Sequence, residues 1–270
     1  MEIRIFDVEH GGCSLLTSDN GSQLLIDSGH NSSTGWRPSD YLPKRGITYL
    51  DALMITNYDE DHASDLANLR ESVAVGTLIS NPSVTGSQIL QLKELGGAGP
   101  GIRSLVEMKS RYSSPGSPFP DPTVGMTCFW NRYPDEFEDE NNLSLVAIIR
   151  YGSFSICFPG DMEADGWRSL LRTGQGFAEA MSTVDVLVAS HHGRANGCCD
   201  ELYDETDLLP DVTIISDSGV QYASQETIAW YRARTSGINF SGQERRVLTT
   251  RRDGRIRIEV DSSGYRVNTF

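Results

Sequence analysis

The stretch from Asn57 to His62 has the sequence Asn-Tyr-Asp-Glu-Asp-His, which places four potential metal ligands within six residues. It follows the apolar run Tyr49–Thr56, which predicts a strand, and it precedes an expected helix over Ala63–Arg70. Carboxylates this close together repel one another unless a cation or a helix N-terminus compensates their charge. An acidic cap for the following helix would explain Asp59 or Asp61 singly, but not the whole cluster with its histidine. The stretch therefore predicts a metal site.

Other apolar runs also end at residues that can bind a metal. The residues concerned are Asp27, Asp161, His191 and His192. Side chains at the ends of neighbouring strands converge on one edge of a sheet. A single histidine is more often a satisfied surface or core imidazole, but three of the five histidines in the chain lie at such ends. Together they favour a metal centre.

The chain has 270 residues and 38% apolar content, which is enough to bury a substantial core. Strands and helices alternate without a break in composition, so we expect one mixed α/β (α+β) domain over residues 1–270. A segment rich in proline, serine and glycine at about 109–125 is too rich in breakers for regular structure, and we interpret it as a loop or lid.

The formal net charge of -14 argues against a surface that follows nucleic acid along its whole length. Arginines are nevertheless concentrated near the end of the sequence. Four of them, Arg245, Arg246, Arg251 and Arg252, define a possible basic face. A solvated, arginine-rich helix and hairpin is the more ordinary interpretation of the same pattern.

The five cysteines are odd in number, lack CxxC spacing and include a vicinal pair, which favours a reducing compartment. There is no leader sequence at the start and no stretch of eighteen apolar residues. We therefore expect a soluble, cytoplasmic protein that does not enter a membrane.

Residues 57–62 resemble the His-x-His-x-Asp-His signature of the metallo-β-lactamase superfamily. They are more similar to the His-x-Asp-x-Asp-His variant in the hydrolase domain of ComEC-type DNA-uptake proteins. Further motifs occur in the order of that family: Phe6–Gly12, Leu25–Gly29, Asn142–Val146, Phe158–Asp161, His191–Gly193 and Thr249–Ile256. The resemblance covers nearly the whole chain and implies an αββα four-layer sandwich with metals at one edge of the paired sheets.

The resemblance also implies two divalent metal ions, zinc or manganese, with magnesium possible. The ligands implied by matching position are Asn57, Asp59, Asp61, His62, Asp161 and one of His191 and His192. Asp61, His62 and one of these two histidines would hold the first ion, Asp59 and Asn57 would hold the second, and Asp161 would bridge both. Asp61, Asp161 and His192 are the expected catalytic residues, and Asp27 would orient the ligands from behind.

Two positions depart from the family pattern. Asn57 stands where the family has a histidine, and Ala223 stands where ComEC-type domains tend to carry another. The Asp59 site is thereby rich in oxygen and poor in nitrogen, which favours manganese, magnesium or calcium over zinc. Such a site would be weak or only partly occupied.

With both ions bound, the expected chemistry is hydrolysis by a metal-bound water, as in a phosphodiesterase or nuclease acting on nucleic acid or a small phosphodiester. A runner-up is a hydrolase of small esters, lactones or phosphocholine-type diesters, which the acidic surface would suit. A degenerate, non-catalytic binding or regulatory module is a third interpretation, because a fold alone does not establish activity. The sequence indicates no particular protein partner.

Overall fold

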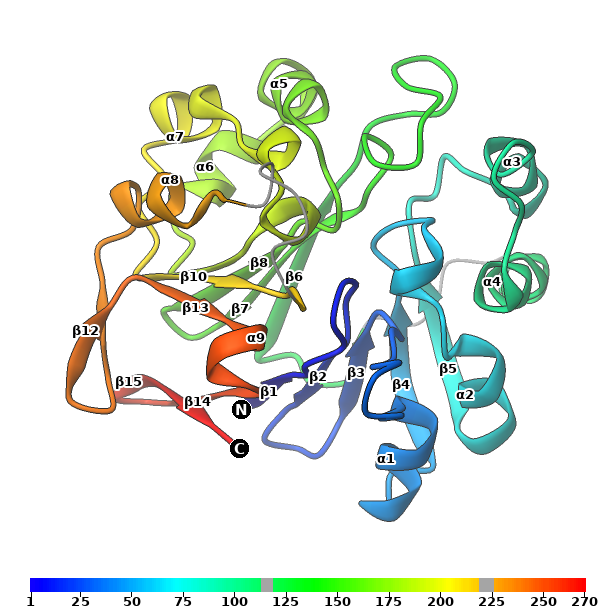
Figure 1. The fold of residues 1–270 in the computed structure, drawn as a ribbon, viewed down its shortest axis with the longest axis horizontal. Coiled ribbons are helices and arrows are strands. Elements are labelled where there is room, and N and C mark those ends of the chain that lie inside the picture. The colour runs from blue at the N-terminus through cyan, green and yellow to red at the C-terminus, as the bar shows by residue number, and fades with distance from the viewer. Residues whose placement is uncertain (113–118, 219–225) are drawn as a thin grey trace.

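Two β-sheets face each other in the computed structural model, and helices cover their outer faces (Figure 1). The structure describes residues 1–112, 119–218 and 226–270. The first sheet has the strand order β15-β14-β1-β2-β3-β4-β5, and the second has the order β13-β10-β9-β8-β7-β6. A separate hairpin is formed by β11 (Ile238–Phe240) and β12 (Gln243–Arg245).

The first sheet combines the opening strands with the closing ones. Its strands are β1 (Glu2–Ile5), β2 (Ser14–Thr17), β3 (Gln23–Ile26), β4 (Tyr49–Met54), β5 (Ala74–Ile79), β14 (Ile256–Asp261) and β15 (Gly264–Thr269). β14 pairs antiparallel with β1, whereas β3, β4 and β5 are parallel to one another. Because parallel strands end at the same edge of a sheet, the residues that follow β3 and β4 meet there.

The second sheet is mostly parallel. Its strands are β6 (Val124–Phe129), β7 (Val146–Tyr151), β8 (Phe154–Phe158), β9 (Val186–Val188), β10 (Val212–Ile215) and β13 (Val247–Thr249). β8, β9, β10 and β13 run parallel, so the segments after β8 and β9 also leave the sheet at one edge. This edge faces the corresponding edge of the first sheet.

Helices form the two outer layers. The first sheet packs against α1 (Pro38–Lys44), α2 (Leu66–Ser72), α3 (Gly86–Leu92) and α4 (Pro100–Arg111). The second packs against α5 (Ala164–Thr173), α6 (Phe177–Met181), α7 (Asp200–Thr206) and α8 (Ile228–Ala233). Short elements complete the chain: η1 (Glu60–His62), η2 (Ser190–Gly193), η3 (Ala195–Gly197) and α9 (Thr250–Asp253).

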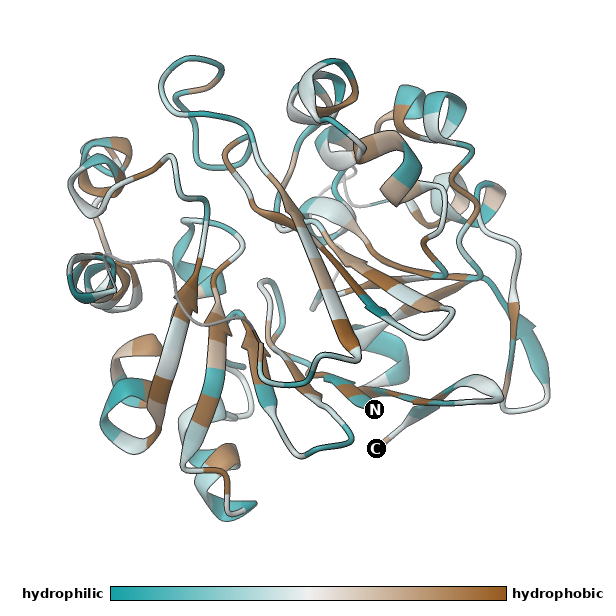
Figure 2. Cartoon of the chain, turned by 180° about the vertical axis from the view of Figure 1, so that it is seen from behind, coloured by the Kyte–Doolittle hydropathy of each residue, from teal (hydrophilic) through white to brown (hydrophobic). Residues whose placement is uncertain are grey.

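Three apolar layers hold these parts together, because successive strand residues point to opposite faces of a sheet. In β3, Ile26 packs between the two sheets, whereas Leu25 packs against the helices of the first sheet. Trp167 and Leu187 belong to the third layer, under α5–α8. Figure 2 shows hydrophobic residues recurring along the strands of both sheets. The predicted αββα sandwich is therefore confirmed.

The predicted loop at about 109–125 is wrong at its boundaries. α4 extends to Arg111, and β6 begins at Val124. The helix continues because Ile102, Leu105 and Met108 recur every three residues and are all buried. Residues 113–118, the centre of the predicted loop, lie outside the described residues.

Within residues 1–112, 119–218 and 226–270, none of the helices has both the length and the apolar character needed to cross a bilayer.

Candidate metal centre

Asp27, directly after β3, contacts the first histidine of the site. Its Oδ1 accepts a hydrogen bond from the backbone N–H of Thr56 at 2.7 Å, and its Oδ2 accepts one from the Thr56 hydroxyl at 2.6 Å. The same Oδ2 lies 2.8 Å from Nδ1 of His62. A carboxylate on one ring nitrogen fixes the imidazole and leaves the other nitrogen free to act as a ligand. The predicted orienting role of Asp27 therefore has the required geometry.

Asp161, which follows β8, lies between two histidines. Its Oδ1 is 2.9 Å from Nε2 of His62 and 3.2 Å from Nε2 of His192. The backbone N–H of Asp161 donates to the hydroxyl of Ser144 at 3.0 Å, which fixes the start of this loop. Asp161 is 2% exposed, so its carboxylate is held inside the protein and directed at the two imidazoles.

His191 and His192 adopt a backbone conformation that is unusual for residues other than glycine. Their φ angles are 50° and 53°, in the left-handed region. Such conformations cost free energy and persist where the surrounding structure fixes them, often at functional sites. Here the turn directs the ring of His192 towards Asp61 and Asp161.

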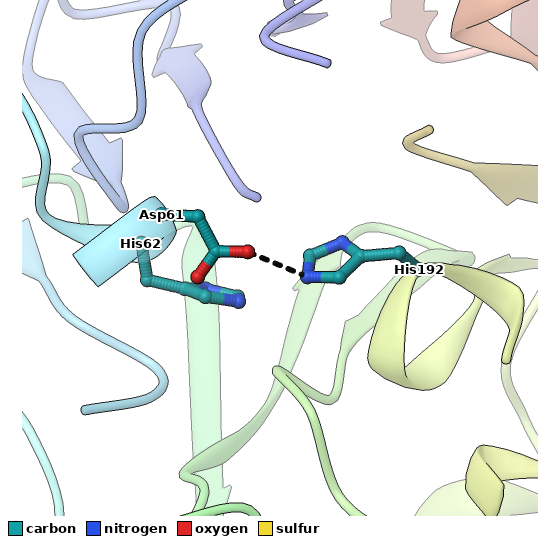
Figure 3. Close-up of side chains that lie close together, drawn as sticks. All are labelled: Asp61, His62 and His192. Atoms are coloured by element: carbon teal, nitrogen blue, oxygen red, sulfur yellow. Dashed lines mark ion pairs between the residues drawn. The ribbon is translucent and has the colours of Figure 1, made fainter. Parts of the chain in front are cut away.

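Asp61, His62 and His192 form the centre of the site. Each offers one potential ligand atom, and these atoms all lie within 4.8 Å of one another. Figure 3 shows Asp61 and His62 projecting from η1 and His192 approaching from the opposite side, with 3.4 Å between Oδ2 of Asp61 and Nε2 of His192. Residues from loops of both sheets therefore meet at a single point.

The pKa values of the clustered histidines and carboxylates depend on one another. Burial alone would lower the pKa of His62, but the carboxylates of Asp161 and Asp27 outweigh it and raise that pKa well above its usual value. Burial is likewise outweighed at His192, where Asp161 and Asp61 raise the pKa to about 9. Burial would raise the pKa of Asp61, but His192 and His62 hold it at about 2. A cation bound at this cluster would displace protons from the imidazoles, because a nitrogen that binds a metal must be unprotonated.

The residues fit one divalent ion. Nε2 of His192 is buried and lies 3.2 Å from Oδ1 of Asp161 and 3.4 Å from Oδ2 of Asp61, so this nitrogen and two carboxylate oxygens face the same point. A cavity of about 40 Å³ borders His62, Asp161 and His192, so these side chains have space to adjust around an ion. Two imidazoles with carboxylates form a donor set that suits zinc or manganese.

His191 lies at the margin of this group. Its Nε2 is 3.8 Å from Oδ2 of Asp161, and its Nδ1 is 3.4 Å from Oε1 of Glu163. Burial lowers the pKa of His191. Of the two adjacent histidines, the geometry thus favours His192 as the ligand beside Asp61 and His62, a choice that the sequence left open.

The structure does not bring Asn57 and Asp59 into the same group. The amide nitrogen of Asn57 donates to Ser144 Oγ at 3.0 Å, and the carboxylate of Asp59 forms an ion pair with Lys93. Sequence reasoning overlooked Lys93, because nothing in its local sequence links it to a residue 34 positions away. It also overlooked Glu163, although its position two residues after Asp161 was a usable signal.

The predicted basic face is largely neutralised. Its arginines form ion pairs with carboxylates: Arg245 with Asp253 at 2.9 Å, Arg246 with Glu244 at 3.2 Å and Arg251 with Asp217 at 2.8 Å. Three of the four charges are thus compensated locally. Ala223, the second departure from the family pattern, lies outside the described residues.

Replacing Asp27 with asparagine should weaken metal binding by about 10-fold to 100-fold, because it removes the carboxylate that orients His62. Asparagine tolerates the left-handed backbone at this position, where φ is 59°. Competition with a chromogenic chelator would measure the dissociation constant. Asp40→Asn, on an exposed residue of α1, is the matched control. Equal affinities in the two variants would contradict a role for Asp27 in orienting the ligand.

Comparisons with known proteins concern the sequence and the fold of the chain. No protein-family model matches the chain. Recombination protein 2 of Haemophilus influenzae is 24% identical over 266 residues, covering 90% of this chain and 28% of that protein. ComE operon protein 3 of Bacillus subtilis is 25% identical over 243 residues, covering 80% of this chain and 28% of that protein. The chain thus spans little more than a quarter of the length of these curated relatives.

Solved structures show a similar arrangement. The CmlA beta-hydroxylase E377D mutant has a TM-score of 0.54 at 14% identity, covering 95% of this chain and 53% of that chain. YhfI from Bacillus subtilis, described as a metallo-beta-lactamase fold protein, has a TM-score of 0.48 at 12% identity, covering 92% of this chain and 96% of that chain. At such identities the likeness concerns the fold alone.

Proposed function

We propose that this chain, which has the metallo-β-lactamase fold and resembles ComEC-type proteins, is a metal-dependent hydrolase of phosphodiesters. The observation that carries the proposal is the buried cluster in which Asp161 lies within 3.2 Å of both His62 and His192. Buried carboxylates and imidazoles that converge on one point are typical of a metal centre.

When bound, a divalent ion supplies two effects: it lowers the pKa of a water ligand, and it neutralises charge that develops on the diester. The protein residues would hold the ion in place and orient its ligands. Asp27 orients His62, while Asp161 and His192 line the centre from the second sheet. The side chain of Asp61 is 36% exposed, so solvent and substrate reach the centre from its side.

We infer the class of substrate from the name of a relative and its size from the charge of this chain. The name of Recombination protein 2 suggests a DNA-related role for that protein, and we extend this to a phosphodiester bond in the substrate of this chain. Carboxylates compensate the charges of Arg245, Arg246 and Arg251, and the net charge of the chain is -14. Since long duplex DNA binds mainly through positive charge on the protein, a small diester or a chain end is the better substrate. The cytoplasmic location stays a prediction, which cell fractionation would test.

The test is an assay of metal-free protein reloaded with manganese or zinc. We expect ion-dependent hydrolysis of bis(p-nitrophenyl) phosphate, and the same preparation is assayed with single-stranded DNA, double-stranded DNA, RNA and p-nitrophenyl acetate. Hydrolysis of the acetate alone would favour the small-ester interpretation. Stoichiometric ion binding without hydrolysis of any substrate would contradict the hydrolase and leave a binding module.

A further inference from the structure

Lys93 brings a fixed positive charge to the place where a second metal ion was predicted. It follows α3, and its side chain is only 11% exposed. Its Nζ forms an ion pair with Oδ1 of Asp59 and lies 3.0 Å from Oε1 of Glu140. Three segments that are distant in sequence thus meet around one ammonium group.

Asn57 is engaged at both ends of its amide. Its Oδ1 accepts the backbone N–H of Asp59 at 2.6 Å, while its Nδ2 donates to Ser144 Oγ at 3.0 Å and to the Glu140 carbonyl at 3.2 Å. These partners determine the orientation of the amide, because a flipped amide would direct its NH₂ at the N–H of Asp59. The oxygen that would bind an ion therefore already uses one of its two lone pairs for the Asp59 N–H.

We propose that the ammonium group of Lys93 takes the place of a second cation, so that the centre binds a single divalent ion. The inference rests on the metal centre of the proposed function and goes beyond it. The donor set at Asn57 and Asp59 is poorly suited to an ion as it stands, because Asn57 contributes no charge and the charge of Asp59 is already compensated by Lys93. A divalent ion beside Asp59 would also lie close to the charge of the largely buried Lys93, and like charges at short range repel each other.

The experiment counts ions. Metal-free protein is saturated with Mn²⁺, excess ion is removed, and manganese per chain is measured by elemental analysis and by electron paramagnetic resonance. We expect one ion per wild-type chain, with the spectrum of an isolated Mn²⁺. Lys93→Met keeps the apolar stem and removes the charge, so we expect binding to rise to two ions and the spectrum to show a spin-coupled pair.

Two further variants complete the design. Lys93→Met combined with Asn57→His restores a nitrogen donor and should bind the second ion more tightly than Lys93→Met alone. Lys44→Met, on an exposed residue of α1, is the matched control and should bind one ion.

Two outcomes would overturn the inference: two ions in the wild-type protein, or one ion in both Lys93 variants. The wild-type count stands even if a variant fails to fold. Two ions together with diester hydrolysis would remove the inference and keep the proposed function. No ion in any of the proteins, together with no hydrolysis, would remove the proposed function as well.

Discussion

Asp161→Asn should abolish stoichiometric metal binding and reduce diester hydrolysis by about 1,000-fold. The carboxylate lies 2.9 Å from His62 and 3.2 Å from His192, so it contacts both imidazoles of the site. A metal ion contributes several kcal/mol to such a reaction, and each 1.4 kcal/mol corresponds to about a factor of ten in rate. Initial rates with bis(p-nitrophenyl) phosphate and manganese content per chain would measure the two effects together.

Asp165→Asn is the matched control for this substitution. Asp165 lies four residues further along the chain, its side chain is 77% exposed, and it forms an ion pair with Arg168 on the surface. Exposed ion pairs contribute little, so this variant should keep wild-type metal content and rate. If both variants retained one ion per chain, Asp161 would not be a ligand of the centre.

Gly11→Ala should destabilise the protein by about 3 kcal/mol and also disturb the metal centre. Gly11 has a φ of 109°, and a Cβ there would lie 2.2 Å from the backbone oxygen of Asp61. Strain and overpacking each cost about 1 to 3 kcal/mol. The backbone nitrogen of Gly11 is also 3.3 Å from Nδ1 of His192, so movement of this loop displaces a predicted ligand.

Urea denaturation and metal titration would measure these two consequences of the Gly11 substitution. Gly96→Ala provides the control, because its Cβ would meet nothing within 4 Å. The close contact at Gly11 would be disproved by an unfolding midpoint equal to that of the control.

The layers of the fold could be predicted from local patterns, whereas several helices could not. The apolar run Leu24–Ile26 that forms most of β3 is visible in the sequence, and so are the turns between strands. α1 was overlooked because Pro43 and few apolar residues obscure its period. α4 was overlooked because the glycines before Pro100 and the prolines after Tyr112 resemble a continuous loop.

The candidate site was predictable where its residues sit at strand ends and not where they depend on tertiary contacts. Asp61, His62, Asp161 and His192 follow apolar strands, and the structure brings them together. The partner of Asp59 could not be predicted, because a lysine after a helix has no periodicity or motif that points to a carboxylate. The engagement of Asn57 depends on Ser144, which is 87 residues away.

Because His62 and Asp161 belong to loops of different sheets and are 99 positions apart, an ion held between them acts as a reversible cross-link. An unfolded chain cannot hold these residues together, so ion binding and the folded state are linked by mass action. Free ion at about 1,000 times its dissociation constant would add about 4 kcal/mol to the free energy of unfolding. If the proposed centre binds its ion, chelation would lower both the proposed activity and the stability of the fold.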